Sequence, residues 1–76
     1  MCNNSVFQQQ RKFNRLAEIL GYKYLKHEQL TPRKFEVTFE VSEWQGTTRF
    51  YVYFGDTEVT FKPASNNVKS QWYKLN

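Results

Sequence analysis

The chain has 76 residues, a formal net charge of +4 and an aromatic content of 18%. A chain of this length forms one small domain, expected here over residues 1–76, and buries only about 60–65% of its unfolded surface. Deep catalytic clefts are hard to build at that size, so a binding module is favoured over an enzyme.

The sequence predicts a cytoplasmic protein with no membrane segment. Its single cysteine, Cys2, excludes an internal disulfide and a thiolate metal cluster, and secreted domains this small usually need such crosslinks. Near the N-terminus, Val6 and Phe7 run directly into three glutamines, which leaves no apolar stretch for a signal peptide. No apolar run approaches the length that crosses a bilayer.

Positive charge is concentrated in the first half of the chain. Residues 1–35 contain seven basic and two acidic side chains, whereas residues 36–76 contain four basic and five acidic ones. The positive potential is therefore expected to belong to the N-terminal half.

The first predicted element is an amphipathic helix over residues 5–20. Ser5 and Gln8 have the spacing of a capping box at its start. Gly21 stands where a left-handed terminating residue is expected. The apolar side chains that share one arc of the helical wheel are Val6, Phe13, Leu16, Ala17 and Leu20.

Residues 21–33 are expected to form an ordered connection that crosses one end of a sheet and can include a short extended piece. Tyrosines and leucines alternate irregularly with lysines in this stretch. Thr31 precedes Pro32, and the residue before a proline is pushed toward extended geometry, so any helix ends there.

Three stretches then alternate apolar and polar residues with the period of half-buried strands, at residues 35–41, 50–54 and 57–61. The fold class is therefore α+β. An N-terminal helix packs on one face of a three-stranded antiparallel meander, which becomes four-stranded if the C-terminal segment is also a strand.

Turn chemistry predicts the registers of the two hairpins. Gly55 and Asp56 suit a two-residue type II′ turn, and residues 43–46 suit a four-residue loop. These turns place Phe39, Phe50 and Phe61 in one row of the inner face. The next rows are Val37, Val52 and Val59, and then Phe35, Phe54 and Thr57.

The same registers define an outer face that carries Tyr51 and Tyr53 on the central strand. Tyr53 would lie between Glu36 and Glu58, whose carboxylates repel phosphate. Aromatic residues on a sheet are typical of stacking platforms for single-stranded nucleic acid, but these charges favour a scaffold role for the sheet.

The C-terminal segment leaves two alternatives open. As a helix, Val68, Trp72 and Leu75 share one arc, and this interpretation is slightly favoured. As a strand following a turn at residues 66–67, Val68, Ser70 and Trp72 share one face.

Catalysis has few candidate residues. His27, the only histidine, lies in a polar stretch without an obvious orienting partner. The three glycines are far apart, so no phosphate-binding loop is expected. We therefore predict no catalytic residue, no cofactor and no metal site.

The leading functional hypothesis is a module that contacts an acidic partner through the basic helix and the connection after it. The favoured partner is the backbone of a nucleic acid. Lysines and arginines would contact phosphates, with adjacent tyrosines as stacking groups. The residues predicted for this site are Arg11, Lys12, Arg15, Tyr22, Lys23, Tyr24 and Lys26. Nothing in the sequence distinguishes DNA from RNA.

The alternative is a protein-interaction module, such as an adaptor or an inhibitor encoded by a mobile element, with a single protein partner. It would use Trp44 at a hairpin tip, Tyr51 and Tyr53 on the outer face, or a free sheet edge. A homodimer formed through a sheet edge belongs to the same alternative.

Overall fold

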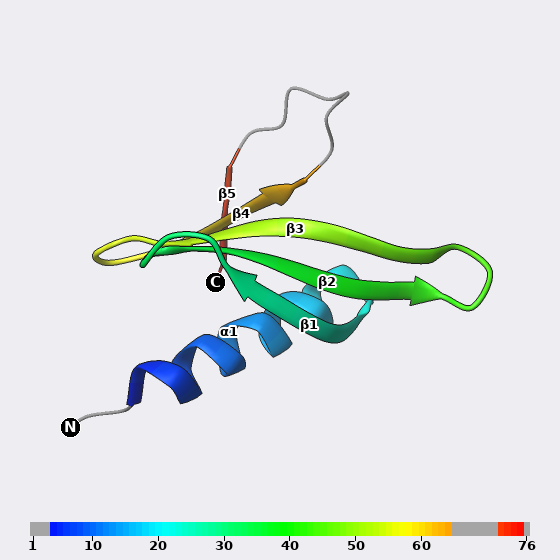
Figure 1. Ribbon diagram of the computed structural model, residues 1–76, viewed down its shortest axis with the longest axis horizontal. Coiled ribbons are helices and arrows are strands. Elements are labelled where there is room, and N and C mark those ends of the chain that lie inside the picture. Colours follow the sequence, from blue (N-terminus) through cyan, green and yellow to red (C-terminus); the bar gives the residue numbers. More distant parts are fainter. Residues whose placement is uncertain (1–3, 65–71, 76) are drawn as a thin grey trace.

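The structure, a computed structural model, describes residues 4–64 and 72–75, with the side chains of α1 described from residue 9 onward. One helix is followed by five strands, which form a single sheet in the order β1-β2-β3-β4-β5 (Figure 1). Each strand pairs antiparallel with its neighbour. The α+β class is confirmed, but the sheet has five strands rather than three or four. The elements are α1 (Asn4–Leu20), β1 (Lys23–Gln29), β2 (Lys34–Ser42), β3 (Gly46–Phe54), β4 (Val59–Pro63) and β5 (Tyr73–Leu75).

The predicted helix is confirmed, and it ends at the predicted glycine. Gly21 has a φ of 76°. The Tyr22 amide donates to the Ala17 carbonyl at 2.9 Å, and the Gly21 amide donates to the Glu18 carbonyl at 3.2 Å. These two bonds form a Schellman motif, which satisfies carbonyls that the end of a helix leaves unpaired.

The expected connection after the helix is instead a strand, β1, which forms one edge of the sheet. Its register against β2 shifts between Tyr24 and Lys26, so Leu25 is an extra residue. Tyr24 and His27, three positions apart, therefore both reach the ring of Phe13 on the inner face. The bulge breaks the period of two, and for that reason the alternation did not reveal this strand.

The β2–β3 hairpin has a different register from the predicted one. Gly46 has a φ of 79° and pairs with Ser42, and Ser42 Oγ accepts a hydrogen bond of 3.0 Å from the Gln45 amide. The loop thus has three residues and an adjacent bulge rather than four residues. As a result Phe39 lies opposite Thr48 instead of Phe50.

The predicted β3–β4 register is also wrong by two residues. In the structure Phe50 pairs with Pro63, and Val52 pairs with Phe61. Gly55 does not adopt the positive φ that the predicted type II′ turn requires. Its amide instead donates to the Glu58 carbonyl at 2.8 Å and closes a longer loop.

That loop is also held to the β1–β2 turn. Arg33 Nη1 lies 2.7 Å from Asp56 Oδ1, and this pairing, with a smaller contribution from Tyr53, raises the pKa of Arg33 above its usual value. The Phe54 amide donates to the Arg33 carbonyl at 2.8 Å. The two turns are therefore joined at one end of the sheet.

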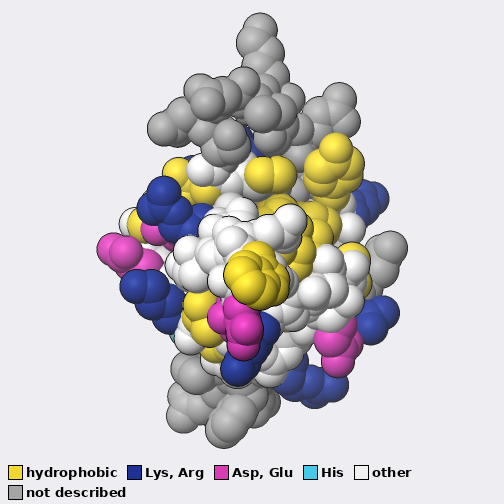
Figure 2. Space-filling model, turned by 90° about the vertical axis from the view of Figure 1, so that its right-hand side faces the viewer, with side chains coloured by type: hydrophobic (Ala, Val, Ile, Leu, Met, Phe, Trp, Pro, Cys, Tyr) yellow, Lys and Arg dark blue, Asp and Glu magenta, His cyan; other side chains and the backbone are white. Residues whose placement is uncertain are grey.

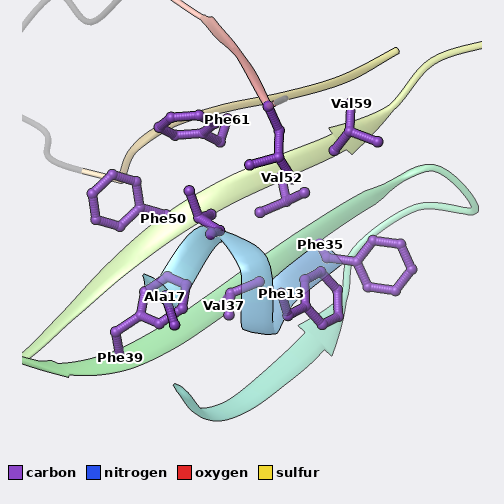
Figure 3. Close-up of a cluster of buried hydrophobic side chains, with 11 residues drawn as sticks. Phe13, Ala17, Phe35, Val37, Phe39, Phe50, Val52, Val59 and Phe61 are labelled. Carbon is purple, nitrogen blue, oxygen red and sulfur yellow. The ribbon is translucent and has the colours of Figure 1, made fainter. Parts of the chain in front are cut away.

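Displacements by two residues leave the side chains of β2, β3 and β4 on their predicted faces. Thr57, predicted for the inner face, instead lies exposed in the loop before β4, and Leu75 of β5 joins the core. Figure 3 shows the helix residues Phe13 and Ala17 facing side chains from the inner face of the sheet. The buried residues are Phe13, Leu16, Ala17, Phe35, Val37, Phe39, Phe50, Val52, Val59, Phe61 and Leu75. The predicted phenylalanine row is replaced by mixed rows, such as Phe35, Val52 and Phe61.

The C-terminal segment is a strand where the structure describes it. Tyr73–Leu75 pairs antiparallel with β4 and buries Leu75, so the helical interpretation is wrong for these residues. Val68 and Ser70 lie outside the described residues. Within the described ranges, no helix combines the length and apolarity needed to cross a membrane.

Candidate functional site

The outer face of the sheet, meaning the face opposite α1, carries the candidate site. The helix lies along the inner face beneath β1 and β2 (Figure 1). Because side chains alternate along each strand, Tyr51 and Tyr53 of β3 point to the outer face, away from the buried Phe50 and Val52.

The observed registers give the two tyrosines neighbours different from those predicted. Tyr53 lies between Lys34 and Thr60, and Tyr51 lies between Glu36 and Lys62. The prediction that two carboxylates flank Tyr53 is therefore wrong. The charge that opposed phosphate binding at this ring is replaced by a lysine.

Three aromatic rings and two ammonium groups meet on the outer face. Lys34 Nζ lies 4.5 Å from the centre of the Tyr51 ring, and Lys62 Nζ lies 4.9 Å from that of Trp72. The Tyr53 and Trp72 rings lie 6.3 Å apart at 63°. We call this set the aromatic–lysine cluster, formed by Lys34, Tyr51, Tyr53, Lys62 and Trp72.

The cluster is accessible and slightly hollowed. Tyr53 is 41% exposed and Trp72 is 40% exposed. Together with Lys34 and Thr60, these two rings line a shallow hollow. Half-exposed rings beside a concave surface provide a place for a flat ligand.

The carboxylates of Glu36, opposite Tyr51, and of Glu58, just before β4, have partners outside the cluster. Glu36 Oε2 lies 3.6 Å from Arg49, and Glu58 Oε1 lies 3.3 Å from Lys74. Among residues 4–64 and 72–75, neither Lys34 nor Lys62 forms an ion pair with a carboxylate. Both ammonium groups can therefore meet an anionic ligand without first breaking an ion pair.

The basic residues predicted from the N-terminal half do not form one patch. Arg11, Lys12 and Arg15 lie on α1, where Arg15 pairs with Glu18 at 3.4 Å. Lys23 and Lys26 lie in β1 at outer-face positions, opposite Glu40 and Thr38. The sheet separates the two groups.

The two tyrosines predicted to stack on bases are partly buried and pack against the core. Tyr22 is half-buried, and its ring lies 6.3 Å from that of Phe39. The centres of the stacked Tyr24 and Phe13 rings lie 6.1 Å apart. The Tyr24 hydroxyl forms a hydrogen bond of 2.6 Å with His27 Nδ1. These rings contribute to packing between α1 and the sheet.

Trp44 lies at the tip of the β2–β3 hairpin and is 94% exposed. Figure 2 looks onto this end of the molecule, where hydrophobic side chains reach the surface among basic and acidic ones. This exposed indole is separate from the aromatic–lysine cluster. Among the described residues, none of the ring–ring or lysine–ring contacts of the cluster involves Trp44.

His27 packs against Phe13 and Phe35. Within the described part of the chain, no group of three or more His, Cys, Asp or Glu side chains is placed to hold a metal ion.

Comparison of the chain with protein-family models, curated proteins and solved structures finds no match. Inference of its function therefore depends on the geometry of its own side chains. Sequence reasoning did not select Lys34, Lys62 or Trp72 for the nucleic-acid site, because only the correct strand registers bring them together with Tyr51 and Tyr53.

Proposed function

We propose that the protein is a small, non-catalytic nucleic-acid-binding module that contacts the phosphate backbone through lysines and arginines. The observation that carries this proposal is the pair Lys34 and Lys62. Neither lysine has a carboxylate partner among the described residues, and each lies over an aromatic ring of the outer face. Phosphate contacts by such groups provide most of the affinity in backbone recognition.

The outer face is favoured over the helix as the main contact surface. Lys23 and Lys26 of the predicted site share this face with Lys34 and Lys62, so four of the chain's lysines can meet one ligand. Arg11 and Lys12 belong to α1, which packs on the inner face, so they can contact a second segment of a long nucleic acid.

Fluorescence anisotropy with labelled DNA and RNA at increasing salt tests this function. We expect binding at low salt that weakens linearly in a plot of log affinity against log salt. The variant Lys34→Gln with Lys62→Gln should reduce the slope for a single strand by about 1.4, since each phosphate contact that is lost removes about 0.7 from it.

The matched control is Arg11→Gln with Lys12→Gln, which removes the same charge from the helix. The sheet-face variant should weaken binding more than this control does. Absence of binding to any DNA or RNA at low salt would exclude the proposed function, and a larger effect of the helix variant would place the contact on α1.

A protein-interaction function is the second candidate, and the exposure of Trp44 favours it. Tryptophans are enriched among the residues that dominate protein interfaces, and this one is almost fully exposed. The open edge of β1 offers a second route, through pairing with a strand of a partner or of another copy.

The two candidate functions differ in salt tolerance and in the residue required. A pull-down from the native host at high salt should recover one stoichiometric protein with the wild-type chain and lose it with Trp44→Ala. Recovery that is unaffected by Trp44→Ala would exclude the hairpin tip as the anchor.

A further inference from the structure

We propose that the aromatic–lysine cluster binds single-stranded nucleic acid by stacking bases on Tyr53 and Trp72, while Lys34 and Lys62 contact the flanking phosphates. This inference deepens the proposed function and rests on it. It specifies the nucleic acid as unpaired, and it assigns the base contacts to rings on the outer face of the sheet.

The ring geometry supports this assignment. Tyr53 and Trp72 are inclined at 63°, with centres 6.3 Å apart, and both border the same shallow hollow. A base that lies flat on one ring would meet the edge of the other, an arrangement that aromatic groups favour. Every base has a π face, so recognition of this kind tolerates different sequences.

The lysines complete the match to a nucleotide. Their ammonium groups lie 4.5 and 4.9 Å from the centres of the Tyr51 and Trp72 rings. A lysine has a flexible stem of four carbons, so its ammonium can move from a ring to a phosphate while the ring accepts a base. Positive charge and accessible rings then meet the two parts of one nucleotide.

A double helix fits this surface poorly. The faces of paired bases are covered by their neighbours in the stack, and rings fixed on a sheet cannot reach them unless the bases are exposed. A duplex can therefore contact the lysines but not the aromatic rings. The proposal thus predicts a preference that charge alone would not produce.

The first experiment compares ligands with the same backbone. In a Trp44→Phe background, Trp72 is the only tryptophan and reports directly on the cluster. The ligands are an oligothymidylate of about ten nucleotides, an abasic strand of equal length and a duplex of equal length. We expect quenching of Trp72 by oligothymidylate and at least about tenfold weaker binding of the abasic strand.

The second experiment changes the rings. Tyr53→Thr keeps a residue suited to a strand, and Trp72→Ala removes a half-exposed side chain. Measured by the anisotropy of labelled strands, which does not depend on Trp72, each should weaken oligothymidylate binding by about fivefold or more and leave abasic binding unchanged. Tyr53→Phe retains the ring and should bind like the parent, while circular dichroism verifies that every variant is folded.

The possible failures are distinguishable. Equal binding of oligothymidylate and the abasic strand would overturn base stacking while leaving the proposed backbone-binding function intact. Equal loss of both ligands in Tyr53→Thr would also overturn it, because the ring would then act only through the structure. Absence of binding to all three ligands and to their RNA counterparts would overturn both proposals.

Discussion

Phe13 is a helix side chain whose ring packs against rings from three strands of the sheet. It has no exposed surface, and its ring lies within 6.1 Å of the rings of Tyr24, His27, Phe35 and Phe54. It therefore contacts residues from β1, β2 and β3, so that one helical residue stabilises much of the fold.

Phe13→Ala should lower the free energy of unfolding by about 3–5 kcal/mol, because it removes buried apolar surface and leaves a cavity. Small domains have total stabilities of about 5–15 kcal/mol, so the variant would be marginally folded. Urea denaturation followed by far-ultraviolet circular dichroism measures the change. Ile19→Ala on the same helix, where the side chain is 48% exposed, should change stability by only about 0.5 kcal/mol.

At the scale of the elements, the sequence predicted the three strands with regular alternation, β2, β3 and β4, but it did not predict β1, the favoured helix at β5 was wrong, and the cross-strand neighbours were wrong. Alternation assigned Phe35, Val37 and Val52 to the inner face, and all three are buried. Both predicted hairpin registers were wrong by two residues. An error of two residues keeps each strand residue on its predicted face of the sheet but changes every cross-strand pair. Local turn preferences do not determine a register when glycine can occupy several positions in a loop.

Gly46 adopts a left-handed conformation beside the bulge of the β2–β3 hairpin, and its substitution tests that role. A side chain at a φ of 79° costs about 1–2 kcal/mol, and a Cβ there would meet no atom within 4 Å. Gly46→Ala should therefore destabilise the protein by about that amount through backbone strain alone. Gly46→Asn should cost less, because asparagine tolerates the left-handed region.

The midpoints of urea denaturation give the comparison. The expected order of stability is wild type, then Gly46→Asn, then Gly46→Ala. Equal stability of the alanine variant and the wild type would contradict the assigned role of the glycine in this hairpin.

At the scale of the whole molecule, the distribution of charge in the sequence was a poor guide to the candidate site. The excess of basic residues in the N-terminal half is real, but the fold divides it between α1 and the outer face. Lys34 and Lys62 come from different halves of the chain and lie on either side of β3. The two lysines are close because β2 and β4 both pair with β3, and a count of charges along the sequence gives no information on strand pairing.

The short last strand has a consequence for how a ligand would be held. Trp72 directly precedes β5, whose three residues include the buried Leu75. The hollow that Trp72 borders therefore depends on the pairing of β5 with β4, so occupancy of the proposed site and docking of the strand would be linked equilibria. A bound base would stabilise the terminal strand, and undocking of that strand would release the base, since such coupling is reciprocal.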